Sequence, residues 1–363
     1  MTRVILSGGG TGGHIFPALA LAEELRRRSP ETKILFLGGD YGPEGQMAAK
    51  AGLDFAALPA RGFIGRGFTR SVGAALRLAG AVGKAVNILR RFQPEVVVGF
   101  GGYAAVAGLL AAFLRGTPCL VHEQNSIPGT ANRLLGKMAR RVCLSFQGAE
   151  QWFPQGKCVF TGNPVRRAVN ILRPPRSEAR HILVLGGSQG ARAVNDAALE
   201  DLELLLQAGF RLRLQSGSRD FERVRERTVA YAEEQVKVEA FIDDMAEAYA
   251  WADLAVCRAG ATTLAELAAA ALPALLIPLP LAAHNHQWVN AEAFRKLGAA
   301  RLLEQKDLGP GILARLARET LGDKDMLRSM STAARLLARP EAAQKLADEA
   351  ESLAVRPADK KRV

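Results

Sequence analysis

A segment in which glycines join a buried strand to a helix occurs twice in this chain of 363 residues. The first copy is Val4–Gly13 (VILSGGGTGG) and the second is Ile182–Ala191 (ILVLGGSQGA). In each copy the glycines let the backbone approach a phosphate, and the start of the helix offers unbonded backbone N–H groups to it. A single doubly wound sheet has no need of a second opening turn halfway along the chain. The repeat therefore predicts two Rossmann-like domains with parallel sheets that face each other across a cleft.

Short apolar runs alternate with longer segments of helical pattern, as in βαβ units whose parallel sheets are covered on both faces. A chain of this length is also expected to form two hydrophobic cores rather than one. The fold class we expect is therefore α/β. The predicted strands are Arg3–Ser7, Lys33–Leu37, Val96–Gly99, Pro118–His122, His181–Leu185, Arg211–Gln215, Leu254–Cys257 and Ala274–Pro278.

We expect one domain over residues 1–163 and a second over residues 164–340. The boundary falls at Asn163–Arg166, and the Pro- and Arg-rich segment Arg173–Arg180 has the composition of a linker. A helical pattern at about 341–357 is a candidate to pack back on the first domain.

Composition limits the classes of partner. Four cysteines without a C-x-x-C pair predict neither a disulfide framework nor a thiolate metal site. The formal net charge of +12 suits nucleic acid, an anionic lipid surface or a phosphorylated substrate. Nucleic acid ranks last, because aromatic residues make up only 6% and no RNP-like, zinc-finger or helix-turn-helix signature occurs.

The apolar segments predict no membrane span. Ala104–Leu114 is too short to cross a bilayer, and Ala271–Ala283 is interrupted by three prolines. Met1–Ser7 lacks the pattern of a secretory signal. We therefore expect a cytosolic protein that can touch a membrane surface.

The first glycine turn leaves two interpretations open by itself. Gly8, Gly10 and Gly13 satisfy G-x-G-x-x-G before the predicted helix Pro17–Arg28. Asp40, after the second strand, stands where an NAD-dependent dehydrogenase keeps its ribose-binding acid. The alternative is a purely structural turn.

His14 follows these glycines directly, so its imidazole should lie beside the anion site. A dinucleotide site has no use for a titratable group there. A reaction at a diphosphate has a use for such a group, because histidine titrates near neutral pH and can serve as a general base. The alternative is a histidine that caps the helix.

The second half of the chain carries two further anion signals. In the second glycine turn, Ser188 adds a hydroxyl that can donate to a phosphate. The alternative is a turn that only packs a strand against a helix. After the strand Leu254–Cys257, the chain turns at Gly260, and Thr262 or Thr263 can cap a helix that runs to about Leu272. Glu266 lies one turn into this helix, where it could accept both hydroxyls of a ribose or complement the helix dipole.

Polar runs follow two other strands. His122-Glu123-Gln124-Asn125 is too polar for a core and is expected to face the cleft. His284-Asn285-His286-Gln287 has the same character, and no acid or cysteine nearby completes a metal site. Asp323-Lys324-Asp325 and Asp243-Asp244 are interpreted as helix caps or turns. The prediction is therefore no metal and no cofactor.

A stripe of basic residues is predicted in the first domain, over Arg70–Arg91. Arg70, Arg77, Lys84 and Arg91 recur every seven residues and share one helix face. The preceding loop holds Phe63, Ile64 and Phe68 among basic residues. Such a surface binds an anionic leaflet, and an ordinary solvated face is the alternative.

Seven segments together resemble the MurG family of bacterial N-acetylglucosaminyltransferases. In chain order they are Gly9–Pro17 (GGTGGHIFP), Gly99–Tyr103 (GFGGY), His122–Asn125 (HEQN), Gly162–Arg166 (GNPVR), Gly186–Ala191 (GGSQGA), Phe241–Met245 (FIDDM) and Arg258–Glu266. The family moves N-acetylglucosamine from UDP-GlcNAc to a lipid-linked muramyl peptide (lipid I) with inversion, giving lipid II. The resemblance implies a GT-B fold, with the acceptor in the N-terminal half and the donor in the C-terminal half. The alternatives are a GT-B UDP-GlcNAc epimerase and, more remotely, an NAD-dependent oxidoreductase.

The resemblance also assigns roles to residues. It implies that Glu266 holds the ribose and that the backbone at Ile242 reads uracil. An inverting displacement needs a base for the acceptor hydroxyl, and His14 is the residue we expect in that role. Donor phosphates would bind Arg166, Ser188 and the helix start at Ala261, Thr262, Thr263, Leu264 and Ala265. The remaining donor contacts would be Thr11, Gly12, Gly13, Asn125, His286 and Gln287, and the acceptor diphosphate would lie near Gly10, Tyr103, His122 and Glu123.

Overall fold

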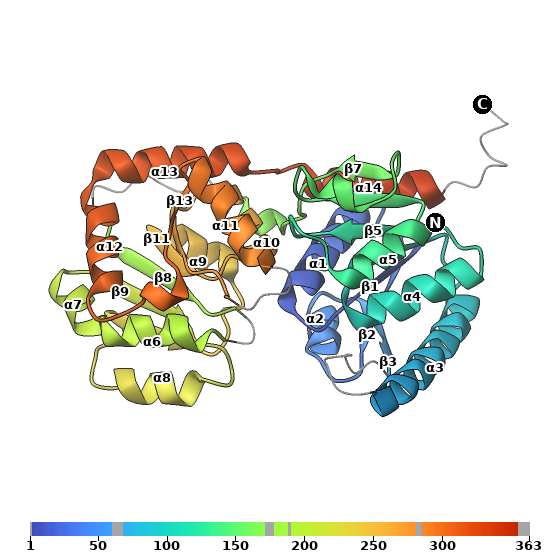
Figure 1. The fold of residues 1–363 in the computed structure, drawn as a ribbon, viewed down its shortest axis with the longest axis horizontal. Helices are drawn as coiled ribbons and strands as arrows, with labels where there is room; N and C mark the ends of the chain where they lie inside the picture. Colours follow the sequence, from blue (N-terminus) through green and yellow to red (C-terminus); the bar gives the residue numbers. More distant parts are fainter. Residues whose placement is uncertain (1, 60–67, 171–177, 188–189, 281–284, 355–363) are drawn as a thin grey trace. The chain divides into compact units, whose positions relative to one another are not determined.

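The computed structural model describes residues 2–59, 68–170, 178–187, 190–280 and 285–354, with only the backbone of residues 68–72 and 74. It divides into two compact units, Met1–Arg166 with Glu341–Val363, and Arg167–Pro340 (Figure 1). The last helix therefore belongs to the same unit as the first strand. Each unit is a parallel sheet covered by helices.

The N-terminal unit contains a seven-stranded parallel sheet in the order β3-β2-β1-β4-β5-β6-β7. Its strands are β1 Arg3–Gly8, β2 Lys33–Gly39, β3 Asp54–Leu58, β4 Val96–Gly101, β5 Cys119–Glu123, β6 Arg141–Leu144 and β7 Cys158–Phe160. Its helices are α1 Gly12–Arg28, α2 Glu44–Lys50, α3 Phe68–Phe92, α4 Gly102–Leu114, α5 Thr130–Met138 and α14 Ala342–Ala354, with a short 3₁₀ helix at Ala149–Trp152.

Two hydrophobic layers cover this sheet. Successive residues of β1 point to opposite faces, so Leu6 packs with α1 and α14 whereas Ile5 packs with α3, α4 and α5. Arg28 of α1 also binds α14 through Asp348 and Glu351, at 2.7 and 2.8 Å. The C-terminal helix is thus part of the core of this unit.

The C-terminal unit repeats the arrangement with six parallel strands in the order β10-β9-β8-β11-β12-β13. They are β8 His181–Leu185, β9 Arg211–Gln215, β10 Val236–Glu239, β11 Leu254–Cys257, β12 Ala274–Leu276 and β13 Ala300–Leu302. The helices are α6 Arg192–Glu200, α7 Leu202–Gln207, α8 Phe221–Thr228, α9 Met245–Trp251, α10 Ala261–Ala269, α11 His286–Lys296, α12 Ile312–Gly322 and α13 Lys324–Leu337, with 3₁₀ turns at Arg167–Val169 and Gln305–Asp307.

The two sheets share one plan, which confirms the predicted pair of Rossmann-like parallel sheets. In each unit the first strand (β1 or β8) lies inside the sheet, and the next strand along the chain pairs on one side of it. After a further strand the chain crosses to the other side, to β4 or β11. The glycine turn follows the first strand, at the point where the strand order reverses and where such sheets bind ligands.

Helix α1 corrects one boundary. It begins at Gly12 rather than at Pro17, which lies inside it. His14 is therefore a residue of the first helical turn and not part of the loop before the helix.

Candidate functional site

The first glycine turn joins β1 to an open helix start. The N-cap of α1 is Thr11, whose side chain makes no capping hydrogen bond, and the first turn contains no acid. Gly10 is exposed and has a φ of +86°, which favours glycine. This start of α1 has the features that attract an anion to a helix N-terminus.

The motif Gly99–Tyr103 packs against this turn. Gly101 and Gly102, where β4 passes into α4, have φ values of +107° and +78°. A Cβ at Gly102 would overlap the carbonyl oxygen of Gly9, and a Cβ at Gly101 would lie 2.9 Å from His14 Nε2. Glycine is needed here so that β4 can approach the turn and the histidine.

His14 is held by the turn that precedes it. Its ring is half-buried, and Nδ1 lies 2.9 Å from the carbonyl oxygen of Gly9. A ring nitrogen that faces a carbonyl must carry a proton, so Nε2 is the basic nitrogen of the neutral imidazole. Because Thr11 is the N-cap, the alternative in which His14 caps the helix is wrong.

Glu44 is a residue of this site that the sequence did not single out. Its side chain, at the start of α2, is only 1% exposed, and Oε1 accepts the backbone N–H of Gly10 at 2.6 Å. Oε2 is buried with no hydrogen-bond partner among the described residues. A Cβ at Gly9 or Gly42 would overlap this carboxylate, so the glycines around it leave room for the acid.

The run His122–Asn125 at the end of β5 does not project outward as expected. His122, Glu123 and Gln124 are buried, and only Asn125 is partly exposed. Most of their polar groups bond to one another and to nearby backbone, which offsets most of the cost of burying them, although Gln124 Oε1 has no hydrogen-bond partner among the described residues. A part in acceptor binding stays a prediction for His122 and Glu123.

The side chain of His122 links strand β5 to the segment that follows strand β7. Its Nε2 lies 3.1 Å from the carbonyl oxygen of Gly162 and its Nδ1 lies 3.1 Å from Gln124 Nε2. Complete burial lowers the pKa of His122 to about 4. Burial raises the pKa of Glu123, although Asn125 and Asn132 donate hydrogen bonds to its two oxygens.

Two other predicted residues belong to the N-terminal unit. Tyr103 is half-buried in the first turn of α4, and burial raises its pKa against the opposing charge of Arg77. The guanidinium of Arg166 lies over the ring of Phe16, 4.8 Å from the ring centroid. Arg166, predicted to bind donor phosphate, thus neighbours helix α1.

The second glycine turn packs against the end of β9. Gly186 donates its N–H to the carbonyl of Gln215 at 3.0 Å. Gly190 has a φ of +80°, and a Cβ there would lie 2.6 Å from the carbonyl oxygen of Ser216. Ser188 lies outside the described residues. The described part of this turn is therefore held by the backbone at the end of β9.

Helix α10 also begins without a side-chain cap. Its N-cap is Gly260, and Thr262 and Thr263 lie inside the helix, so the predicted threonine cap is wrong. The N-cap residue precedes the first helical residue, so a threonine at the second or third helical position does not occupy the N-cap. The helix ends at Ala269, before the predicted Leu272, and its first turn contains no acid. Ala261, Thr262, Thr263, Leu264 and Ala265 thus form an uncapped helix start.

Glu266 follows in the next turn of α10. Its side chain is 6% exposed, and Oε2 accepts a hydrogen bond from the hydroxyl of Tyr249 at 2.8 Å. The backbone N–H of Ile242 donates to Gln215 Oε1 at 2.9 Å. Tyr249 and Gln215 are further residues of this edge that sequence patterns did not reveal.

The predicted sugar contacts lie at the start of α11. His286 and Gln287 are both partly exposed, and Gln287 Oε1 accepts the N–H of Leu279 at 3.0 Å. His284 lies outside the described residues. Asp244 and Asp323 cap α9 and α13, as interpreted from the sequence. Within the described ranges, no three acids, histidines or cysteines gather as metal ligands.

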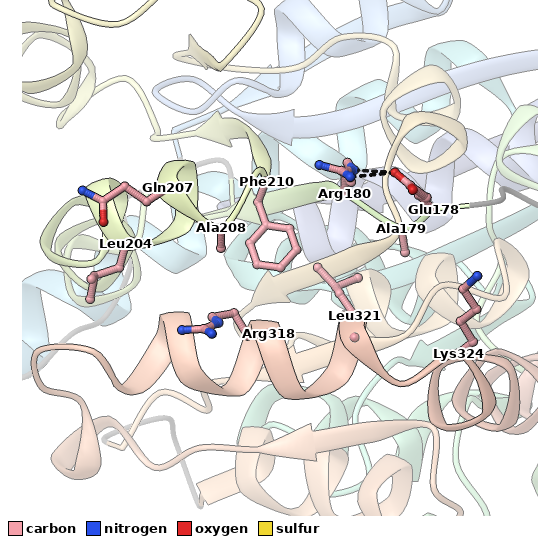
Figure 2. A pocket seen from close by; sticks show the side chains of 11 residues that line it. Glu178, Ala179, Arg180, Leu204, Gln207, Ala208, Phe210, Arg318, Leu321 and Lys324 are labelled. Carbon is pink, nitrogen blue, oxygen red and sulfur yellow. Dashed lines mark hydrogen bonds and ion pairs between the residues drawn. The ribbon is translucent and has the colours of Figure 1, made fainter.

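A separate depression of about 500 Å³ lies at the amino-terminal ends of β8 and β9 (Figure 2). Phe210 and Leu321 form its apolar part, and Arg180, Arg318 and Lys324 bring positive charge. Because both glycine turns follow the carboxyl ends of strands, this depression is not part of the predicted donor site.

The basic stripe lies on α3. Arg77, Lys84 and Arg91 are exposed, and Ala81, Ala85 and Leu89 are buried. Leu76, beside Arg77, is 69% exposed. Phe63 and Ile64 fall outside the described residues, and the side chains of Phe68 and Arg70 are not described. Within the described part of the chain, no helix is long and apolar enough to cross a bilayer.

Two Rossmann-like units with a glycine turn after the first strand of each sheet are the architecture of the GT-B fold. Residues 4–144 match the glycosyltransferase family 28 N-terminal domain, and residues 181–347 match the glycosyltransferase family 28 C-terminal domain. The class is therefore a glycosyltransferase, not a dehydrogenase.

Curated relatives narrow the class. A transferase from Nitratidesulfovibrio vulgaris (strain DP4) named UDP-N-acetylglucosamine--N-acetylmuramyl-(pentapeptide) pyrophosphoryl-undecaprenol N-acetylglucosamine transferase is 51% identical over 96% of both chains. One of the same name from Myxococcus xanthus is 42% identical over 96% of this chain and 92% of its own. The crystal structure of Acinetobacter baumannii MurG superposes with a TM-score of 0.74, at 31% identity over 97% of this chain and 100% of that one. The chain belongs to glycosyltransferase family 28 and, within it, to the MurG transferases.

A UDP-GlcNAc 2-epimerase from Neisseria meningitidis also superposes, with a TM-score of 0.67 over 96% of this chain and 99% of its own. Its sequence identity is 12%, so this likeness shows the fold alone. The epimerase alternative is the weaker one.

Proposed function

We propose that this protein transfers N-acetylglucosamine from UDP-GlcNAc to the muramyl 4-hydroxyl of lipid I, which gives lipid II for peptidoglycan synthesis. The observation that carries the proposal is the 51% identity, across nearly the full length of both chains, to a transferase whose name states this reaction.

The donor would bind at the carboxyl edge of the C-terminal sheet. The uncapped start of α10, from Ala261 to Ala265, would hold the diphosphate with Ser188 and Arg166. Glu266 would accept the ribose hydroxyls, and the backbone at Ile242 would contact uracil. His286, Gln287 and Asn125 would contact the sugar, and Thr11, Gly12 and Gly13 would complete the donor contacts.

Inversion of the configuration at the anomeric carbon requires a single displacement. The acceptor hydroxyl attacks the anomeric carbon on the face opposite UDP, and the bond between that carbon and the diphosphate oxygen breaks. His14 Nε2 takes the hydroxyl proton, while Gly9 holds Nδ1–H and thereby the tautomer. The electron pair passes to UDP, where helix-start N–H groups and Arg166 stabilise the added charge.

The acceptor would bind at the N-terminal unit. Its diphosphate would meet the first glycine turn at Gly10, near Tyr103, with His122 and Glu123 supporting the strand end behind. Arg77, Lys84 and Arg91, together with Arg70, Phe63, Ile64 and Phe68, would hold the unit on an anionic membrane surface at the cytoplasmic face.

The test follows labelled UDP-GlcNAc with and without a short-chain lipid I analogue. Label that enters the lipid only when the acceptor is present supports the proposal. Conversion of the sugar to its epimer without acceptor would instead indicate an epimerase, and reduction of NAD would indicate an oxidoreductase.

A further inference from the structure

We propose that Tyr249 is the positioning residue for Glu266, and that its hydroxyl sets the affinity of the donor site for the ribose. The inference rests on the proposed function, because it takes Glu266 as the ribose-binding carboxylate.

The contact joins two helices of the donor edge. Tyr249 lies on α9 and Glu266 on α10, and the hydroxyl donates to Oε2 at 2.8 Å. Tyr249 is fully buried, at 0% exposure, and is the largest side chain in the chain's described part to be so enclosed. A ring packed on all sides keeps its hydroxyl in one place.

A glutamate side chain needs such a partner. Its several rotatable bonds carry conformational freedom that must be lost before a carboxylate can accept two neighbouring hydroxyls. A hydrogen bond to a charged group in a buried setting is among the stronger ones, so the tyrosine pre-orients the acid before the ribose arrives.

The segment that precedes α9 would make the contact to uracil. The segment 240–244 leads directly into α9, Ile242 lies in it, and Asp244 caps the helix by accepting the N–H of Glu247 at 2.9 Å. The Tyr249 hydrogen bond therefore ties the segment that would contact uracil to the helix that would contact ribose. A shift of either segment would therefore disturb this hydrogen bond.

The experiment measures steady-state kinetics of Tyr249→Phe with UDP-GlcNAc and with its 2′-deoxyribose analogue. We expect the KM for UDP-GlcNAc to rise about five- to tenfold with kcat nearly unchanged, and the KM for the analogue to change much less. Tyr231→Phe is the matched control, because Tyr231 packs against the core of the same unit and its hydroxyl makes no hydrogen bond within the described residues. Thermal midpoints without ligand are measured for both variants.

An equal rise in KM for both donors, or no rise, overturns the role of Tyr249. The variant Glu266→Gln distinguishes failure of this inference from failure of the proposed function. If its KM changes equally for UDP-GlcNAc and for the analogue, Glu266 does not bind the ribose. If Tyr249→Phe lowers the thermal midpoint, this variant and its double variant with Glu266→Gln are assayed below that midpoint, and the double variant decides. The tyrosine should then add almost nothing to the KM effect of the glutamine, and additive effects contradict the proposal.

Discussion

The carboxyl edges of the two sheets are built on one plan but with different chemistry. At the N-terminal edge, His14 and Glu44 contact the glycine turn, and His122 and Glu123 lie at the end of β5 in the same sheet. At the C-terminal edge, the turn rests on the backbone of β9, and the proposal uses Glu266 and His286 there only to hold the donor. A proton must leave the acceptor, whereas the donor need only be held. The difference agrees with the proposal, which places the catalytic base in the N-terminal unit and most of the nucleotide contacts in the C-terminal unit.

The largest expected effect tests His14. His14→Ala should lower kcat by roughly 10²–10⁴-fold, because a general base contributes about that much. UDP binding, measured by calorimetry, should be nearly unchanged. Near-normal turnover would remove the base from the N-terminal edge and with it the contrast between the two units.

The second prediction concerns His122 and acid stability. Because burial lowers its pKa from about 6.5 to about 4, the unfolded chain binds a proton in this window that the folded chain does not. His122 therefore reduces stability as pH falls from about 6.5 to 4, by up to about 3 kcal/mol. Glu123, whose pKa is raised, acts in the opposite direction.

The measurement is urea unfolding of the protein and of His122→Gln between pH 4 and pH 7. The difference between the two should shrink or reverse toward pH 4, since glutamine does not titrate there. A difference that stays constant with pH would show that His122 is not held neutral in the folded unit.

The third prediction compares surface charges in the two units. Arg77→Glu with Lys84→Glu should lower partition onto anionic vesicles by about 30-fold or more, since each basic residue contributes about 1 kcal/mol near the surface. Arg318→Glu with Lys324→Glu, at the depression in Figure 2, makes the same change in net charge in the other unit. Equal release by both pairs, in sedimentation with vesicles, would reduce the stripe on α3 to a solvated face.

The smallest effect concerns Glu44. Glu44→Ala should raise the KM for the lipid I analogue about tenfold, or about 1.4 kcal/mol, because Gly10 loses the acceptor of its N–H. Glu44→Gln keeps an oxygen for that N–H and should do less harm. The KM for UDP-GlcNAc should hardly change, because the second turn has backbone partners instead. A rise in donor KM as large as in acceptor KM would contradict the comparison.

Much of the fold could be predicted from residue patterns alone. The strands β8, β9 and β11 have the predicted bounds, because β8 and β11 are mainly apolar and buried, β9 alternates leucines with polar residues, and each is followed by glycine or polar residues. The strands that were missed are β3, β6, β7, β10 and β13, which are five residues long or shorter. Short strands of mixed polarity carry little periodicity, and their pairing partners supply most of their order.

The two glycine turns, the place of His14 directly after the first and that of Glu266 on its helix could be read from the residues alone, because each depends on neighbours along the chain. Tertiary structure alone decided which distant side chains support them. Glu44 reaches Gly10 across 34 residues, and Tyr249 reaches Glu266 across 17. It also decided that His122 is buried, since the carbonyl of Gly162 that pairs with it comes from 40 residues away. Local patterns fix backbone turns, whereas hydrogen bonds between separate elements exist only once the sheet has brought those elements together.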